Sequence, residues 1–102
     1  MIILNPKCLV ITPSTRDFIE NLINYYISEA SSYREITEIY DNEVKNIPDA
    51  TFGMILGCVY SGFLQMYTNQ KQQPSLEDIQ EFNQIMKDRT LQIKKAILGN
   101  RS

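Results

Sequence analysis

The feature that most constrains this chain is a regular stripe of apolar and aromatic residues in its first half. Its members are spaced alternately by four and three residues, and eight of the nine are apolar or aromatic. They are Ile19, Ile23, Tyr26, Ala30, Tyr33, Thr37, Tyr40, Val44 and Ile47. These spacings place side chains on one face of an α-helix, with a repeat of seven residues. The stripe therefore predicts helix over residues 14–46.

The length of this segment leaves two alternatives open. A single helix over residues 14–46 would be about 50 Å long at the usual helical rise. A compact chain of 102 residues has a diameter of only roughly 33 Å. An unbroken helix would extend beyond its own core, so either the chain bends near Ser31 and Ser32 or a second subunit covers the overhang.

Turn and capping residues mark the ends of this first helical segment. Residues 1–12 contain two short apolar runs separated by Asn5-Pro6, which predicts an extended arm or a β-hairpin. Ser14 is the predicted N-cap of the helix that follows. Pro48 is expected to end that segment, and Asp49 is the predicted N-cap of the next helix.

Two further helices are expected, at residues 50–68 and 75–98. Ser75 caps the second of these, and Gly99 is a natural stop at its end. The fold class predicted for residues 1–102 is a single, mainly α domain. We expect a three- to four-helix antiparallel bundle with a short extended N-terminal arm or β-hairpin.

The helix expected at residues 50–68 is the most apolar of the chain. Because it offers no strongly polar face, we expect its large side chains to be almost wholly buried: Phe52, Ile55, Leu56 and Val59. Small residues recur on it every four positions, at Gly53, Gly57 and Ser61. Such a stripe predicts close packing against another helix, so that Gly57→Leu would destabilise the fold by overpacking.

A membrane-spanning role for this helix is not expected. Residues 50–70 carry no charge and are about as long as a bilayer span. However, polar residues interrupt the segment, and its continuous apolar part covers only residues 52–60. Buried helices of globular bundles have this composition, so we expect no contact with a membrane.

The sequence contains no residues that indicate catalysis or metal binding. Histidine is absent, which excludes histidine-based triads, histidine acid–base chemistry and most zinc sites. Cys8 and Cys58 form neither a Cys-x-x-Cys pair nor a disulfide framework, and no glycine-rich phosphate loop occurs. We therefore expect a protein that is not an enzyme and has no cofactor, located in the cytoplasm because no signal peptide is evident.

Charge is unevenly distributed along the chain. Residues 16–49 contain eight acids and three bases, whereas residues 87–102 contain five bases and one acid. The basic last helix leaves open the alternative that the protein is a small nucleic-acid-binding regulator. However, no aromatic residue lies among its bases, so nucleic acid is an unlikely partner on this pattern. A small-molecule-binding protein with a pocket lined by Tyr26 or Tyr60 is a third alternative.

The interpretation that we favour is a small non-enzymatic protein-interaction or regulatory module. A homo-oligomer is expected, because the stripe is long and tyrosines suit interfaces. A protein partner of another kind is also possible on this pattern. The residues predicted to form the oligomer interface are Ile19, Ile23, Tyr26, Tyr33, Tyr40 and Val44.

Overall fold

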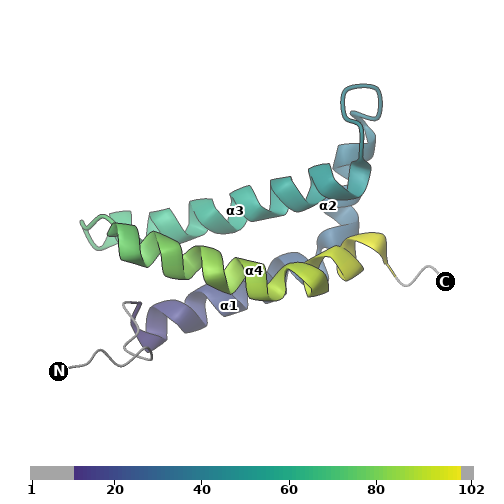
Figure 1. The fold of residues 1–102 in the computed structure, drawn as a ribbon. Coiled ribbons are helices and arrows are strands. Elements are labelled where there is room, and N and C mark those ends of the chain that lie inside the picture. Colours follow the sequence, from purple (N-terminus) through teal and green to yellow (C-terminus); the bar gives the residue numbers. More distant parts are fainter. Residues whose placement is uncertain (1–10, 100–102) are drawn as a thin grey trace.

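The protein is described over residues 11–99 by a computed structural model that contains four α-helices in this range. They are α1 (Pro13–Ser28), α2 (Ala30–Glu38), α3 (Ile47–Asn69) and α4 (Leu76–Leu98). In Figure 1, α1, α3 and α4 run along one another, with α3 antiparallel to the other two. The prediction of a mainly helical bundle is confirmed, whereas residues 1–10 of the predicted arm or hairpin lie outside the described residues.

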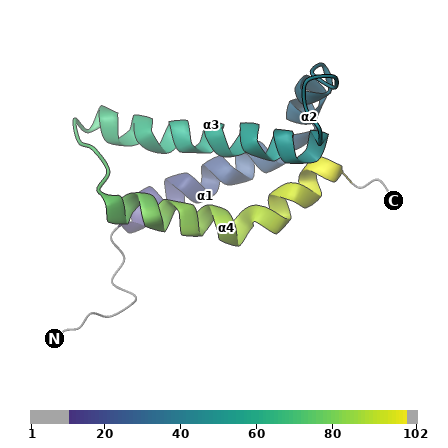
Figure 2. The ribbon, with the colours of Figure 1, turned by 45° about the horizontal axis from the view of Figure 1, so that its top comes forward.

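The chain bends at Glu29, between α1 and α2. Glu29 leaves the helical conformation, with φ −105° and ψ 11°, while its amide still donates to the carbonyls of Tyr25 and Tyr26. The small Ala30 is buried at the corner. Of the two alternatives left open by the length of the stripe, the bend is therefore the one observed, two residues before Ser31. Figure 2 shows α2 standing across the end of the bundle where α4 also ends.

The second helix ends at Glu38, well before the predicted end at residue 46. Beyond it, tight turns continue: the amides of Ile39, Tyr40 and Asp41 donate to carbonyls three residues earlier. The heptad spacing continues through this segment, but the segment packs too little to sustain a helix, and most of its side chains are exposed.

Three predictions about helix ends need correction. The first helix is capped by Thr12, whose hydroxyl accepts from the Thr15 amide at 3.2 Å, so Ser14 was wrongly assigned as the cap. Asn46 caps α3 by accepting from the Asp49 amide at 2.8 Å, so Asp49 was wrongly assigned as the cap. Proline is well tolerated in the first turn of a helix, which explains why Pro48 lies in the first turn of α3 instead of ending its predecessor.

The last helix matches its prediction closely. Ser75 forms a capping box with Asp78: the Ser75 hydroxyl accepts from the Asp78 amide, and the Asp78 carboxylate accepts from the Ser75 amide. At its other end, Gly99 has a φ of 73°, which favours glycine. Together these contacts fix both ends of α4.

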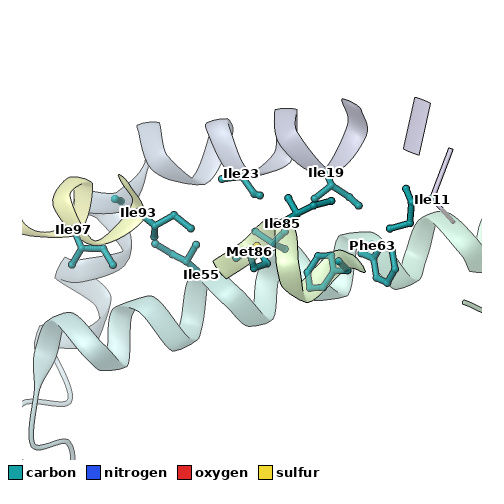
Figure 3. Close-up of a cluster of buried hydrophobic side chains, with 12 residues drawn as sticks. Ile11, Ile19, Ile23, Ile55, Phe63, Ile85, Met86, Ile93 and Ile97 are labelled. Atoms are coloured by element: carbon teal, nitrogen blue, oxygen red, sulfur yellow. The ribbon is translucent and has the colours of Figure 1, made fainter. Parts of the chain in front are cut away.

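The core lies between α1, α3 and α4 and is built mainly from isoleucine and phenylalanine (Figure 3). Ile19 and Ile23 reach it from α1, and the rings of Phe63 and Phe82 stack across α3 and α4 with centroids 4.6 Å apart. The other buried apolar residues are Ile11, Ala30, Ile55, Val59, Ile85, Met86, Ile93 and Ile97. The helix α2 contacts the end of α4 through a hydrogen bond of 2.6 Å, which the Arg34 guanidinium donates to the Ile97 carbonyl.

The helix α3 buries only one of its faces. Ile55 and Val59 are wholly buried, as predicted, but Phe52 and Leu56 are only half-buried. The small-residue stripe was wrongly placed against another helix, because Gly53, Gly57 and Ser61 are exposed. A Cβ atom at position 53 or 57 would meet nothing within 4 Å. The predicted overpacking by Gly57→Leu therefore has no structural basis.

Among the described residues, α3 is also the one helix long and apolar enough to cross a membrane by length and composition. Only 22% of its most apolar window is buried. A single helix of this kind is weak evidence for a membrane span, because core helices of globular proteins have the same composition. Its buried face packs against all three other helices.

Candidate interaction surfaces

The structure separates the residues predicted to form an oligomer interface. Ile19 and Ile23 have no exposed surface and belong to the chain's own core. Tyr26 and Tyr33 are half-buried, and their rings pack with centroids 5.4 Å apart. Val44 is also half-buried, so that only Tyr40 is exposed, at 53%. Because the bend returns most of the stripe to its own core, the overhang that led us to expect a second subunit does not exist.

Tyr40 instead belongs to an exposed apolar cluster at the end of α2. Ile36, Ile39 and Tyr40 are 43%, 76% and 53% exposed. Since helical turns continue past Glu38, residues spaced by three and four lie on one side of the chain. We call these three residues the α2 tip. Large apolar side chains exposed side by side are a feature of interaction surfaces.

Carboxylates surround the α2 tip. Glu35, Glu38, Asp41 and Glu43 all lie within nine residues, and all four are exposed. The Glu38 carboxylate is 3.7 Å from the Arg34 guanidinium, but residues 35–43 contain no base. Lys45 is exposed two residues beyond Glu43, so the α2 tip is an apolar cluster with a mainly negative rim.

A hollow lies at the other end of α2, where the α1–α2 bend meets the last turns of α4. It has a volume of about 460 Å³, and its lining includes Ile27, Ser28, Ser31, Gln92, Lys95 and Ala96. We call it the bend hollow. Two large apolar residues of α4 beside it in sequence, Leu91 and Leu98, are 68% and 53% exposed. The hollow therefore has a mixed lining, in which Ile27 and Ala96 are the apolar side chains and Lys95 is the charged one.

An open apolar groove runs between α3 and α4. One part, of about 310 Å³, is lined by Gly53, Leu56, Gly57, Tyr60, Ile79 and Asn83 among others. A second part of about 340 Å³ shares Leu56 and Asn83 with it and continues towards Lys87. The groove exists because the glycines contribute no side chains to its α3 wall. The predicted tyrosine-lined pocket has this counterpart at Tyr60, whereas Tyr26 does not line it.

Two bases of the last helix, Arg89 and Lys94, contact other side chains of the same chain. The Arg89 guanidinium donates to the carboxylate of Glu20 and to the Asn24 side chain. The Lys94 ammonium lies 3.5 Å from the Asp49 carboxylate and 5.3 Å from the centre of the Phe52 ring. These contacts reduce the positive surface that the sequence suggested for nucleic acid.

Two tyrosines have raised pKa values, for structural reasons. Burial, with smaller contributions from Cys58 and Tyr33, raises the pKa of Tyr26 from 10.0 to about 12. Burial, followed by the neighbouring Asp78 carboxyl, raises the pKa of Tyr67. Both phenols are protonated at neutral pH, and we assign these two side chains a role in packing. Over residues 11–99, no three residues of the types that bind metals gather in one place.

Comparison with protein-family models, with curated proteins and with solved structures finds no match. The function is therefore inferred from the surfaces of this chain alone.

Sequence reasoning missed the two isoleucines of the α2 tip as candidate interface residues, because they lie off the heptad stripe. A signal for them exists: Ile36 and Ile39 stand among four acids and no base, which is unusual for a core-facing helix. Lys95 and its neighbours were noted only for their charge, since nothing in the sequence shows that α2 and α4 meet.

Proposed function

We propose that the protein is a small non-enzymatic protein-interaction module, located in the cytoplasm, that contacts its partner through the α2 tip. The observation that supports this most is the exposure of Ile36, Ile39 and Tyr40 together on one projection. Burying an exposed isoleucine side chain is worth about 1.5–3 kcal/mol. A partner that covers the α2 tip therefore gains free energy that the isolated chain does not.

The carboxylates around the tip define the chemistry of that partner. An apolar recess is needed for Ile39 and Tyr40, and basic groups at its edge would complement Asp41 and Glu43. Charged rims contribute mainly to association rate and selectivity, whereas the apolar centre contributes most of the affinity. This combination favours a protein surface over a nucleic acid, because the rim is negative.

A photo-crosslinking amino acid at position 39 tests this proposal in cells that express the chain. We expect a discrete crosslinked product from position 39. Position 76 is the matched control, because Leu76 is 66% exposed but lies at the start of α4, at the opposite end of the bundle (Figure 1). No product at position 39, or the same products at both positions, would contradict the proposal.

The α3–α4 groove supports a second candidate function, the binding of a small apolar ligand. Its lining is mainly apolar, with Tyr60 and Asn83 as polar groups, and its volume reaches the lower range of ligand pockets. Gly57→Leu would fill the groove without a clash, since nothing lies within 4 Å of that position. An anilinonaphthalene sulfonate dye should lose its fluorescence enhancement in this variant, and an unchanged signal would exclude the groove as its site.

A further inference from the structure

We infer that the partner of the α2 tip is a second copy of this chain, and that two copies form a closed dimer by docking each tip into the other's bend hollow. This inference rests on the proposed function and identifies the partner. It depends on three observations: the position of both surfaces on one helix, their shapes and their charges.

The two surfaces lie at opposite ends of the same helix. Ser31, in the first turn of α2, lines the bend hollow, and Ile39 lies about 12 Å further along at the helical rise. If two α2 helices pack antiparallel about a two-fold axis, each tip reaches the partner's hollow at the same time. Figure 2 shows that α2 stands at the end of the bundle where α4 also ends.

The shapes of the two surfaces are complementary along this axis. One side of α2 carries the small Ser32 near its start and, seven residues further along, the large Ile39 after its end. An antiparallel arrangement places the large residues of one copy against the small residues of the other. The hollow of about 460 Å³ offers space for these side chains, with Ile27 and Ala96 in its lining.

The charges are complementary as well. The tip has four carboxylates around it, whereas the hollow has Lys95 in its lining and no acid among its lining residues. Lys95 is exposed. In the proposed dimer, Tyr40 of the other copy would lie beside it, and Asp41 and Glu43 follow that tyrosine in the sequence. A negative rim around an apolar tip thus meets a hollow whose one charged lining residue is a lysine.

The small size of the contact favours symmetry. One tip in one hollow brings together the three residues of the tip and the seven that line the hollow, whereas a stable interface usually has about 20–30 residues on each side. Two-fold exchange places both surfaces of each copy in the contact without further surfaces, and it closes the assembly. A one-way contact would instead extend into an open chain of copies.

Light scattering over a range of concentrations tests the inference on the whole chain. We expect the mass to rise from 11.8 kDa to a plateau at twice this value. Ile39→Ser should weaken the dimer by about tenfold or more, because each dimer loses the contact twice. The matched control is Leu76→Ser at the opposite end of the bundle, which should leave the dimer unchanged.

Charge reversal provides a sharper test of the pairing. Lys95→Glu makes the hollow negative, and the double variant Asp41→Lys/Glu43→Lys makes the rim more positive, so each variant alone should be largely monomeric. Mixing the two variants should restore the dimer, since both contacts in the mixed pair then join opposite charges. Lys87→Glu, the same change on the same helix but about 12 Å away, should leave the dimer intact.

Failure of the inference can be distinguished from failure of the proposed function. A monomer at every concentration, no restoration on mixing, or a mass that rises beyond twice 11.8 kDa without a plateau would each overturn the closed dimer. A crosslink from position 39 to a different protein would also overturn it, but would leave the α2 tip as an interaction surface.

Discussion

The three glycines of α3 give the sharpest test of how this helix is oriented. Glycine in the interior of a helix costs about 1 kcal/mol relative to alanine. At Gly57, a Cβ atom would meet nothing within 4 Å. Gly57→Ala should therefore stabilise the fold by about 1 kcal/mol, which corresponds to a rise of about 4–8 °C in Tm for a domain of this size.

Gly62 should respond differently, because it faces α1. A Cβ atom at this position would lie 2.5 Å from the Cδ2 atom of Leu22, well inside van der Waals contact. The obstructing atom is the end of a half-buried leucine side chain that can turn aside, so the cost should lie near the lower end of the about 1–3 kcal/mol typical of overpacking. Gly62→Ala should therefore be less stable than Gly57→Ala by about 1 kcal/mol.

A double-mutant cycle attributes this difference to its cause. In the background of Leu22→Ala the obstructing methyl group is absent, so Gly62→Ala should regain a stabilising effect. The free energy of unfolding is measured by urea denaturation followed by circular dichroism. If Gly62→Ala and Gly57→Ala stabilise the fold equally, the placement of Gly62 against α1 is wrong.

Three further predictions concern a cap, a buried phenol and the basic helix. Thr12→Ala should destabilise the fold by about 1 kcal/mol because it removes the cap of α1, whereas Ser14→Ala should change stability by less than about 0.5 kcal/mol. If urea denaturation shows a larger loss of stability for Ser14→Ala than for Thr12→Ala, Ser14 is the cap. The pKa of Tyr26 is higher in the folded state, about 12 against 10.0, so its stabilising contribution is complete below pH 10 and is lost as the pH rises to 12. Tyr26→Phe should thus flatten the alkaline loss of stability, and an unchanged pH profile would contradict this assignment. Duplex DNA should not bind at near-physiological salt, and tight, salt-sensitive binding that is lost in Lys94→Glu/Lys95→Glu would contradict this expectation.

Local signals in the sequence predicted the last helix well. Ser75 and Gly99 have caps and conformations of the expected kind, because capping depends on neighbouring residues alone. The bend was anticipated as one of two alternatives from the length of the stripe. The early end of α2 was not, since Tyr40 and Val44 continue the heptad spacing through segments that have little to pack against.

The orientation of α3 was the main error, and it has a physical reason. An apolar helix gives no strong indication of which side faces the core, and small residues suit both close packing and open surface. One signal was overlooked: the most polar stripe of this helix consists of Asp49, Gly53, Gly57, Ser61, Gln65 and Asn69 at every fourth position, all of them exposed. That stripe marks the side facing solvent.

Oligomerisation was predicted from residues that proved to be largely core. The two surfaces now proposed to form the contact, the α2 tip and the bend hollow, come together only through the tertiary fold. The hollow requires the bend at Glu29 and the contact of Arg34 with the end of α4, and the second of these joins residues far apart in the sequence. Sequence pattern therefore led to an expectation of self-association but did not point to the surfaces now proposed for it.

A residue-resolved nuclear magnetic resonance dilution series tests the central claim most directly. Spectra recorded from millimolar to micromolar protein report each backbone amide separately. We predict concentration-dependent shifts at Ile39 and Tyr40 and, together with them, at Ser31 and Lys95, while Leu76 stays unchanged. Spectra that do not change with concentration, or shifts confined to the exposed stripe of α3, would contradict the claim that the α2 tip and the bend hollow join two copies of this chain.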